Sequence, residues 1–435
     1  MELKEAPEQR KEQRGFKLTD VGLYPVEWKI RKLGDLFEIT SSKRVFQSEW
    51  KTAGIPFYRA RELAVLSQAG RVDNKLFITE EMYNEFKARY GVPAIGDLLV
   101  TGVGTLGKVF VVRDNSRFYF KDGNIIWFKL AGALDPNYLQ QLYLTRVIIK
   151  QIEDSAEGTT VGTYTITGAK KTLIPLPPTL AEQHAIATAL SDVDGLIAGL
   201  EGLLAKKRAL KQGAMQQLLS GQKRLPGFTG EWDELQVRDV ILDNFSGPSP
   251  TCEERNIRGE REWGVLKTTA ATWENGWDWR AHKTLPPVFW NRRHIELRKG
   301  DVIVTKAGPR HRVGVSAWID YVPERIIPSG KMIALRPNQE KVVPFMLAHA
   351  IAAPAAQVFL DQRTTGMAES QMNFENDALL TTPIKLPKIK EQQAIAEVLS
   401  DFDADVLALE AKLGKTRLLK QGMMQELLTG RVRLV

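Results

Sequence analysis

The sequence predicts a mixed α/β (α+β) protein in which two pseudo-repeated domains are joined by two long helices that pair as an antiparallel coiled coil. Residues 182–225 recur as residues 391–434 at a constant offset of 209 (391 − 182), with identity at more than half of the positions. Both copies carry an apolar seam that is typical of paired helices. The segments between them alternate short apolar runs with turn residues, which is typical of strands and loops.

Each copy of the repeat is predicted to form one helix of about 40 residues, or about 60 Å at 1.5 Å per residue. Its apolar residues recur at alternating spacings of four and three, as in a heptad seam. The seam residues are Ile186, Leu190, Val193, Ile197, Leu200 and Leu204 in the first copy, and Ile395, Leu399, Phe402, Val406, Leu409 and Leu413 in the second. Thr179 and Glu182 form a capping-box pattern, and Gly221 and Gly430 mark the helix ends. We expect each seam to pair with the other copy, and two helices that lie on their own domains are the alternative.

A second repeat precedes each helix by about the length of a domain. Glu27-Trp28 matches Glu231-Trp232 at an offset of 204 (231 − 27). The expected unit is therefore a variable domain followed by a long helix, used twice, with the domains at opposite ends of the helix pair. The predicted divisions are an N-terminal tail at residues 1–20, a first domain at 21–178, a first helix at 179–222, a second domain at 223–387 and a second helix at 388–435.

Both variable domains are expected to be loop-rich. Gly96–Thr101 and Gly300–Thr305 share a Gly-Asp pair, an apolar run and a final threonine, which predicts matching strands. Helices are expected at residues 136–151 and 344–360, the second with a break at Pro354.

Composition is that of a soluble globular protein. The sequence is 43% hydrophobic and 26% charged, and no stretch reaches the roughly 18 uncharged apolar residues that a membrane span requires. Met1 to Arg14 has no apolar core, so no signal peptide is expected. The lone cysteine, Cys252, excludes an internal disulfide and a multi-cysteine zinc site, which favours a cytoplasmic location. A formal net charge of +8 is compatible with a polyanionic partner.

Two segments resemble catalytic motifs. Gly102–Gly107 matches Gly-x-Gly-x-x-Gly, but an apolar β-branched run follows it, so we predict a strand-to-strand turn and keep a cofactor site as the second choice. Asp135–Tyr138 resembles the Asp-Pro-Pro-Tyr motif of adenine methyltransferases, but Asp followed by Pro is also a standard helix start, which we favour. The five histidines show no metal-ligand spacing. No catalytic, cofactor or metal site is assigned.

Basic and hydroxyl-bearing residues gather in the predicted loops of both domains. Arg and Lys neutralise phosphates and recognise guanine, while Ser and Thr fix the register on DNA. Any one of these residues could be solvated surface, but as a set they predict DNA contact. Trp273, Trp277 and Trp279 are expected to pack in the core or against a helix instead of stacking on bases. The candidates are Ser41, Ser42, Lys43, Arg44, Arg59, Arg61, Thr101, Thr105, Lys108, Thr159, Thr160 and Tyr164 in the first domain, and Lys267, Thr268, Lys306, Arg310, Arg312, Lys331, Arg363 and Thr364 in the second.

The junction Ile174–Gln183, with its Pro177-Pro178 pair before the first helix, resembles the proline-rich junction and spacer helix of type I restriction–modification specificity (S) subunits. Val21–Trp28 looks like that family's entry into its first target-recognition domain, and Gly264–Thr268 looks like a segment of the second. The resemblance covers the layout of the whole chain. The second junction departs from the pattern because it has one proline, Pro387, where the first has two.

This resemblance implies a non-catalytic subunit that binds double-stranded DNA at a bipartite target, with one domain for each half-site and the helix pair setting the gap. The implied partners are two modification (methyltransferase) subunits and the restriction (translocase/nuclease) subunits, which would use S-adenosylmethionine, ATP and Mg. The chain itself is expected to bind no cofactor and no membrane. Two alternatives stay open: an adenine-specific DNA methyltransferase or fused restriction–modification enzyme, and a stand-alone DNA-binding regulator.

Overall fold

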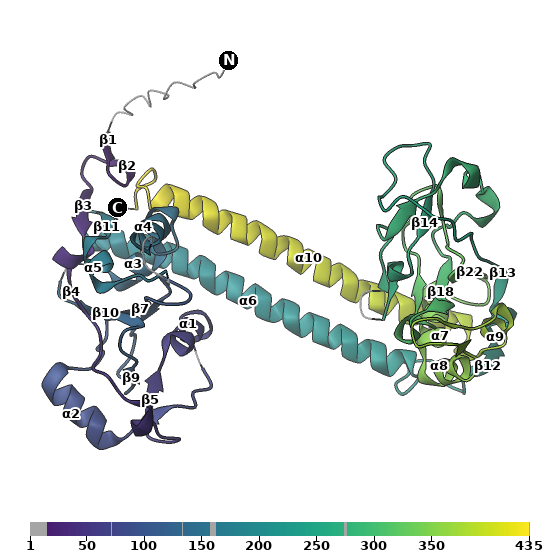
Figure 1. Ribbon diagram of the computed structural model, residues 1–435, viewed down its shortest axis with the longest axis horizontal. Coiled ribbons are helices and arrows are strands. Elements are labelled where there is room, and N and C mark those ends of the chain that lie inside the picture. Colours follow the sequence, from purple (N-terminus) through teal and green to yellow (C-terminus); the bar gives the residue numbers. More distant parts are fainter. Residues whose placement is uncertain (1–14, 71, 133, 157–161, 274–275, 435) are drawn as a thin grey trace, which may run out of the picture. The chain divides into compact units, whose positions relative to one another are not determined.

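The computed structural model describes residues 15–70, 72–132, 134–156, 162–273 and 276–434, and the chain divides into two compact units. Unit 1 contains the described residues up to 201 and those from 411 onward, and unit 2 contains residues 202–410. Each unit holds one α/β domain and a part of both long helices (Figure 1). Among the described residues, no helix combines the length and the apolar character needed to cross a bilayer.

The two repeat copies form the long helices α6 (Leu180–Leu219) and α10 (Ile389–Leu427), which have 40 and 39 residues. In unit 1, Lys420 pairs with Asp194 and Arg417 pairs with Glu201, each at 2.6 Å. In unit 2, Lys207 pairs with Asp405 at 2.6 Å, and Lys211, one turn further along α6, pairs with Asp403. In both units the residue numbers rise along one helix as they fall along the other, so the predicted antiparallel pairing is confirmed.

The seam residues near the start of each helix are buried in the core of a domain, whereas the other seam residues are buried or half-buried further along the helices. Ile186 and Leu190 belong to the core of the first domain, together with Leu427 and Leu428 from the end of α10. Ile395 and Leu399 join the core of the second domain in the same way, with Leu218 from the end of α6. The start of each helix therefore packs both on its own domain and on the end of the other helix. The remaining seam residues are buried (Leu200, Leu204, Leu413) or half-buried (Val193, Ile197, Phe402, Val406, Leu409).

Domain 1, in unit 1, is built around the four-stranded antiparallel sheet β4-β10-β7-β8. Leu98 and Val100 point to a core that includes residues of α3 and α4, whereas Leu99 points to the opposite face and a second core under α1, because side chains alternate along a strand. The elements are β1 (Phe16–Thr19), β2 (Gly22–Pro25), β3 (Lys29–Lys32), β4 (Phe37–Thr40), β5 (Ile55–Tyr58), α1 (Ala60–Ala69), β6 (Phe77–Ile78), α2 (Glu80–Tyr90), β7 (Leu98–Thr101), β8 (Val109–Val111), β9 (Tyr119–Phe120), β10 (Ile125–Leu130), α3 (Pro136–Leu142), α4 (Arg146–Ala156), α5 (Ile166–Lys171) and β11 (Leu173–Leu176).

Domain 2, in unit 2, repeats this arrangement of paired strands. We call the arrangement that the two domains share the frame. The sheet β13-β22-β18-β20 of domain 2 matches β4-β10-β7-β8, and its ladder β12-β25 matches β3-β11. The parallel pair β14-β21 matches β5-β9. The elements are β12 (Asp233–Gln236), β13 (Ile241–Phe245), β14 (Gly264–Leu266), β15 (Ala271–Thr272), β16 (Gly276–Trp277), β17 (His282–Thr284), β18 (Val302–Thr305), β19 (Ala307–Gly308), β20 (Ser316–Trp318), β21 (Ile326–Ile327), β22 (Met332–Pro337), α7 (Pro344–Ala352), α8 (Pro354–Asp361), β23 (Thr365–Gly366), β24 (Met372–Asn373), α9 (Asn376–Leu380) and β25 (Pro383–Leu386).

Three predicted boundaries need correction. Residues 16–19, which were predicted to lie in a tail, form β1 and pair with β2. The single helix predicted at residues 136–151 is two helices, because the hydroxyl of Thr145 donates to the carbonyl of Leu142 at 2.6 Å and closes a turn between α3 and α4. The capping box is half formed, since the hydroxyl of Thr179 accepts from the N–H of Glu182 while the Glu182 carboxylate binds Arg433. The break at Pro354 is confirmed.

Candidate nucleic-acid interface

The sheet of domain 1 brings polar loops from distant parts of the sequence to one end of its strands. Because the strands are antiparallel, the carboxyl ends of β4 and β7 and the amino ends of β8 and β10 lie at the same end of the sheet. The N–H of Lys121 donates to the carbonyl of Tyr58, which adds the carboxyl end of β5. The loop end of domain 1 is defined here as residues 41–44, 58–61, 101–108 and 121–124.

Serine hydroxyls fix the first of these loops. The hydroxyl of Ser41 donates to the carbonyl of Ile125 at 2.9 Å, and that of Ser42 donates to the carbonyl of Phe120 at 2.7 Å. Ser42 is buried, so it holds the loop and does not face solvent. Lys43, the next residue, is exposed.

The turn between β7 and β8 is built on a buried threonine. Thr101 is 1% exposed, and its hydroxyl accepts from the N–H of Lys108 at 3.0 Å and donates to a carbonyl within the turn. A Cβ on Gly102 would lie 2.6 Å from the carbonyl oxygen of Tyr164, so only glycine fits there. The Gly102–Gly107 motif thus forms the predicted strand-to-strand turn and opens no helix that could face a phosphate.

A hollow of about 530 Å³ lies between this turn and helix α1. The side chains of Arg61, Thr105, Lys108 and Asn124 line it, together with small apolar residues of α1. Three of these four were predicted contacts that lie far apart in the sequence, and the fold brings them together. Asn124 was missed because a single asparagine in a loop is most often a turn residue. It occupies the place of Lys331 in domain 2, since its carbonyl accepts from the β7–β8 turn as that of Lys331 accepts from the β18–β20 turn.

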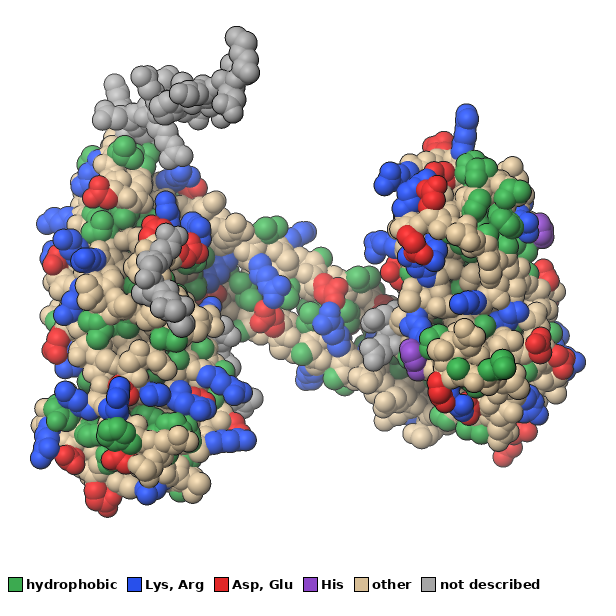
Figure 2. Space-filling model, viewed as in Figure 1, with side chains coloured by type: hydrophobic (Ala, Val, Ile, Leu, Met, Phe, Trp, Pro, Cys, Tyr) green, Lys and Arg blue, Asp and Glu red, His purple; other side chains and the backbone are tan. Residues whose placement is uncertain are grey.

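Two of the predicted cations in domain 1 are neutralised within the chain. Arg44 pairs with Asp122 at 2.9 Å, and Arg59 pairs with Glu62 at 2.7 Å. The hydrogen bonds that the Arg59 guanidinium donates to the Glu62 carboxylate raise the pKa of Arg59. In Figure 2, Lys and Arg side chains form a band across unit 1 at about the level of α1 and β9. Within the part of the chain that the structure describes, the predicted cations without a carboxylate partner are Lys43, Arg61 and Lys108.

Tyr164 is a core residue, and the prediction that it contacts DNA is corrected. It is 1% exposed, and its hydroxyl lies 3.2 Å from that of Tyr143 and 2.8 Å from that of Thr172. Burial raises the pKa of Tyr164. Its place in domain 2 is taken by the buried Phe374, whose N–H donates to the equivalent turn, so the position needs an aromatic ring and not a DNA contact. Thr159 and Thr160 lie outside the described residues.

Domain 2 has the same loop end on the same frame, but with longer loops. Thr305 is fully buried, and its carbonyl accepts from the N–H of Gly314 at 2.8 Å, as the carbonyl of Thr101 accepts from Gly107 at the same distance. The loop between these anchors is longer in domain 2. The loop end of domain 2 is defined here as residues 246–249, 267–273, 305–314, 328–331 and 363–373.

Contacts between these loops hold them in fixed positions. The guanidinium of Arg312 donates to the carbonyl of Thr268 at 2.8 Å. The indole N–H of Trp273 donates to the carbonyl of His311 at 3.2 Å. Trp273 was predicted to pack in the core or against a helix, but it is 50% exposed, so the first of these alternatives is wrong for this residue. An exposed aromatic side chain therefore lies within the basic loops.

Two of the predicted cations of domain 2 are also neutralised by ion pairs within the chain. Arg310 pairs with Asp361 at 2.6 Å, and Lys267 pairs with Glu254 at 3.2 Å. Thr364 is half-buried, and its hydroxyl donates to the carbonyl of Leu360 in the last turn of α8. Among the described residues, the predicted cations without a carboxylate partner are Lys306, Arg312, Lys331 and Arg363.

An arginine in the segment that follows each long helix binds a glutamate at the start of the other helix. In unit 1, Arg433 donates two hydrogen bonds to the fully buried carboxylate of Glu182. In unit 2, Arg224 does the same to the buried Glu391, at 2.5 Å for both bonds. The neighbouring glutamine, for example Gln183, accepts from the N–H of the residue before α3. The Glu-Gln pair of the repeat therefore joins each domain to both helices.

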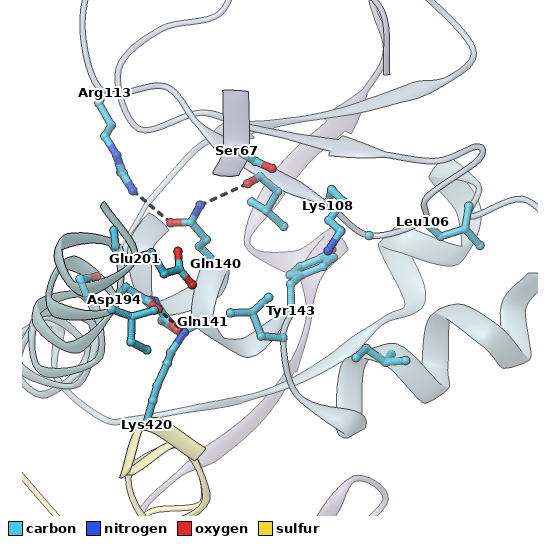
Figure 3. A pocket seen from close by; sticks show the side chains of 17 residues that line it. Ser67, Leu106, Lys108, Arg113, Gln140, Gln141, Tyr143, Asp194, Glu201 and Lys420 are labelled. Atoms are coloured by element: carbon cyan, nitrogen blue, oxygen red, sulfur yellow. Dashed lines mark hydrogen bonds and ion pairs between the residues drawn. The ribbon is translucent and has the colours of Figure 1, made fainter. Parts of the chain in front are cut away.

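A pocket of about 620 Å³ in unit 1 lies between the β7–β8 turn, α3 and the long helices (Figure 3). Lys108 and Arg113 line its domain side, and Asp194 and Lys420 form an ion pair on its helix side. Gln141 donates to Asp194 at 3.1 Å. Glu201, which also lines the pocket, pairs with Arg417, so both of the acidic side chains that line it among the described residues are neutralised by a cation of α10.

The segment that resembles a methyltransferase motif is a helix start. A carboxylate oxygen of Asp135 accepts from the N–H groups of Asn137 and Tyr138 at 2.8 and 3.1 Å, and Pro136 is the first residue of α3. Tyr138 is fully buried, and its hydroxyl donates to the carbonyl of Pro175. It cannot stack on a base. Among the described residues, no group of three or more His, Cys, Asp or Glu side chains is arranged to hold a metal ion.

Known proteins share both the sequence pattern and the fold. The model of the type I restriction modification DNA specificity domain matches residues 25–206 and 292–416. The chain is 29% identical to the Type I restriction enzyme EcoEI specificity subunit of Escherichia coli over 208 residues, which cover 45% of this chain and 34% of that relative. It is 23% identical to the putative type I restriction enzyme MjaX specificity subunit of Methanocaldococcus jannaschii, over 96% of each chain.

A solved structure shows the same fold. The S subunit of the type I restriction–modification system from M. genitalium aligns with a TM-score of 0.53 at 16% identity, covering 92% of this chain and 96% of that one. The family model covers more than half of the chain and spans parts of both domains and both helices. The chain therefore belongs to the family of type I restriction–modification DNA specificity subunits, whose function is the recognition of DNA sequence.

Proposed function

We propose that this chain recognises a bipartite duplex DNA target, with the loop end of each domain contacting one half-site. The observation that carries the proposal is that one frame occurs twice with different loops at the same end of its sheet. A shared frame with different recognition loops is what two unlike half-sites require. The free cations Lys43, Arg61 and Lys108 in domain 1 supply phosphate contacts or guanine recognition.

The long helices set the gap between the half-sites in this proposal. Helix α6 leads without interruption from the end of domain 1 to the start of domain 2 and has 40 residues, or about 60 Å at 1.5 Å per residue. Ion pairs to α10 stiffen it within each unit. A stiff connection converts its length into a fixed number of unspecified base pairs.

We further propose that the chemistry belongs to partner chains. Relatives such as the EcoEI protein are named specificity subunits of type I restriction enzymes. Two modification subunits using S-adenosylmethionine, and restriction subunits using ATP and Mg, would assemble with this chain. Lys207, Arg208 and Arg417 of the helices bind carboxylates of the paired helix, so these three cations have less free charge for partners or DNA.

Mapping of methylated sites in cells that carry this chain with its modification subunits tests the proposal. We expect one bipartite motif with a fixed gap, and the motif should disappear when this chain is omitted. The purified chain alone, given S-adenosylmethionine and duplex DNA, should transfer no methyl group. A motif without a gap, or methyl transfer by the chain alone, would contradict the proposal.

A further inference from the structure

We propose that the hairpin β23–β24 of domain 2 enters the major groove, and that Glu369 at its tip recognises a base amino group. The inference rests on the proposed function, because it assigns part of one half-site to one segment. The contacts predicted from the sequence include Arg363 and Thr364, directly before this segment, but none within it.

The hairpin is an ordered structure. Its strands pair with each other, and β24 also pairs with β19, which directly follows the end of β18. A Cβ on Gly366 would lie 2.4 Å from the carbonyl oxygen of Gln371, so glycine is needed for the strands to approach. At the tip, the N–H of Arg310 donates to the carbonyl of Glu369 at 2.8 Å. The backbone of the tip is therefore fixed to the basic loop 305–314.

The side chains of this fixed tip face solvent. All residues from 365 to 371 are exposed, and Met367 is 104% exposed, which means that it packs against nothing in the chain. The exposed hairpin is a short two-stranded ribbon, and such a ribbon is one of the two elements that fit the major groove, which is about 12 Å wide. Met367 then offers an apolar contact to a thymine methyl group.

The charge of Glu369 selects the kind of contact. The guanidinium of Arg310 pairs with Asp361 and not with Glu369, so the Glu369 carboxylate has no ion-pair partner among the described residues. A carboxylate is repelled by phosphates, and the groups on DNA that attract it are the amino groups of cytosine N4 and adenine N6 in the major groove. Arg363, close to the hairpin in sequence, lies over the ring of Phe359 and has no carboxylate partner among the described residues, so its charge is left to attract the flanking backbone.

Glu369→Gln and Met367→Ala test this assignment in the full complex with its modification subunits. Both residues are exposed, so neither change threatens folding. Glu340→Gln is the matched control, because Glu340 is an exposed acid that follows β22 at the opposite end of the same sheet. The readout is the methylated motif and the affinity for DNA carrying each single-base change.

We expect Glu369→Gln to lower discrimination about tenfold at one position of one half-site, a position occupied by cytosine or adenine on one strand. Met367→Ala should act at an adjacent position in the same half-site and by a smaller factor. The other half-site and the gap should stay unchanged, and Glu340→Gln should have no effect.

Other results separate the two proposals. If the complex without substitutions methylates a bipartite motif and neither variant changes that motif, the hairpin inference fails and the proposed function stands. An equal loss of affinity for every sequence would mean that the hairpin only contacts the backbone, which also overturns the inference. If the complex without substitutions methylates no bipartite motif, the proposed function fails, and the hairpin inference fails with it.

Discussion

The two domains share a frame and differ where the strands end. In domain 1 the β7–β8 turn is a short glycine turn over the buried Thr101, and helix α1 stands beside it. In domain 2 the equivalent loop, over the buried Thr305, is longer and is braced by a hairpin and by Arg312. This difference indicates that the frame can carry different loops, because the residues that anchor those loops, Thr101 and Thr305, are buried inside it.

The shared features are buried polar contacts. Asp97 and Asp301 both begin the strand under the turn, and each is buried and accepts several hydrogen bonds. The binding partner differs: Asp97 accepts from the indole of Trp127, whereas Asp301 accepts from Arg336. A buried carboxylate needs partners, but more than one kind of side chain can supply them.

The largest effect is expected where the two units are most alike. Arg433→Ala in unit 1, or Arg224→Ala in unit 2, should lower the free energy of unfolding by about 3 kcal/mol, because each change leaves a buried glutamate without its counter-ion. Chemical denaturation measures this loss in the free energy of unfolding. Arg417→Ala is the matched control, since its ion pair with Glu201 is solvent-exposed and should contribute about 1 kcal/mol or less. Equal losses in all three variants would show that the buried pairs have no special role.

A smaller effect should distinguish the two loop ends. Arg312→Ala should weaken binding at one half-site by about 1–3 kcal/mol, and Lys108→Ala should weaken binding at the other half-site by a comparable or smaller amount. Competition binding with DNA altered in one half-site at a time measures this. If either variant affects both half-sites equally, its side chain contacts phosphates and the division between the domains is not supported by that residue.

The third effect, which appears only in acid, concerns stability and should be confined to unit 2. Burial, with a contribution from Lys211, lowers the pKa of His349 to about 4. Because the unfolded chain takes up a proton near pH 6.5 and the folded chain does not, stability should fall as the pH drops from 6.5 towards 4, by about 2 kcal/mol at pH 5. Domain 1 has Gln141 at the equivalent place in α3. His349→Gln should therefore flatten the dependence of the thermal midpoint on pH, and an unchanged slope would mean that another group causes it.

The sequence predicted the parts of the molecule that depend on periodicity. The heptad seam from Ile186 gave the long helices to within a few residues, because one spacing persisted over many turns. It also gave the helix start at Asp135 and the turn at Gly102–Gly107, whose local chemistry is specific. It could not separate the buried Thr101 from the exposed Thr105, since burial in a loop is decided by distant strands.

The same limit explains the errors in the candidate site. Tyr164 follows polar residues in the sequence, which favoured an exposed position, but its N–H donates to the carbonyl of Gly102 and its side chain is buried in the core. Trp273 looks like a core residue by type, but its indole has a partner at the surface and its ring stays half exposed. Aligning the two domains strand by strand would have found Asn124 through its counterpart, Lys331.

The most direct test of the central claim, that two separate loop ends recognise half-sites at a distance set by the helices, is a change of helix length. Four residues inserted between Glu201 and Gly202 in α6, and four between Glu410 and Ala411 in α10, add about one turn to each helix, ~6 Å at 1.5 Å per residue. Every ion pair described above within a unit keeps its register. An insertion in α6 alone is the control, because it shifts one helix against the other.

The methylated motif of the complex carrying both insertions is the measurement. DNA rises ~3.4 Å per base pair, so we expect the gap to grow by one or two base pairs while both half-site sequences stay the same. The single insertion should give a smaller change or a loss of activity. An unchanged gap with full activity would show that the helices do not set the distance, and a changed half-site would show that recognition extends beyond the loop ends.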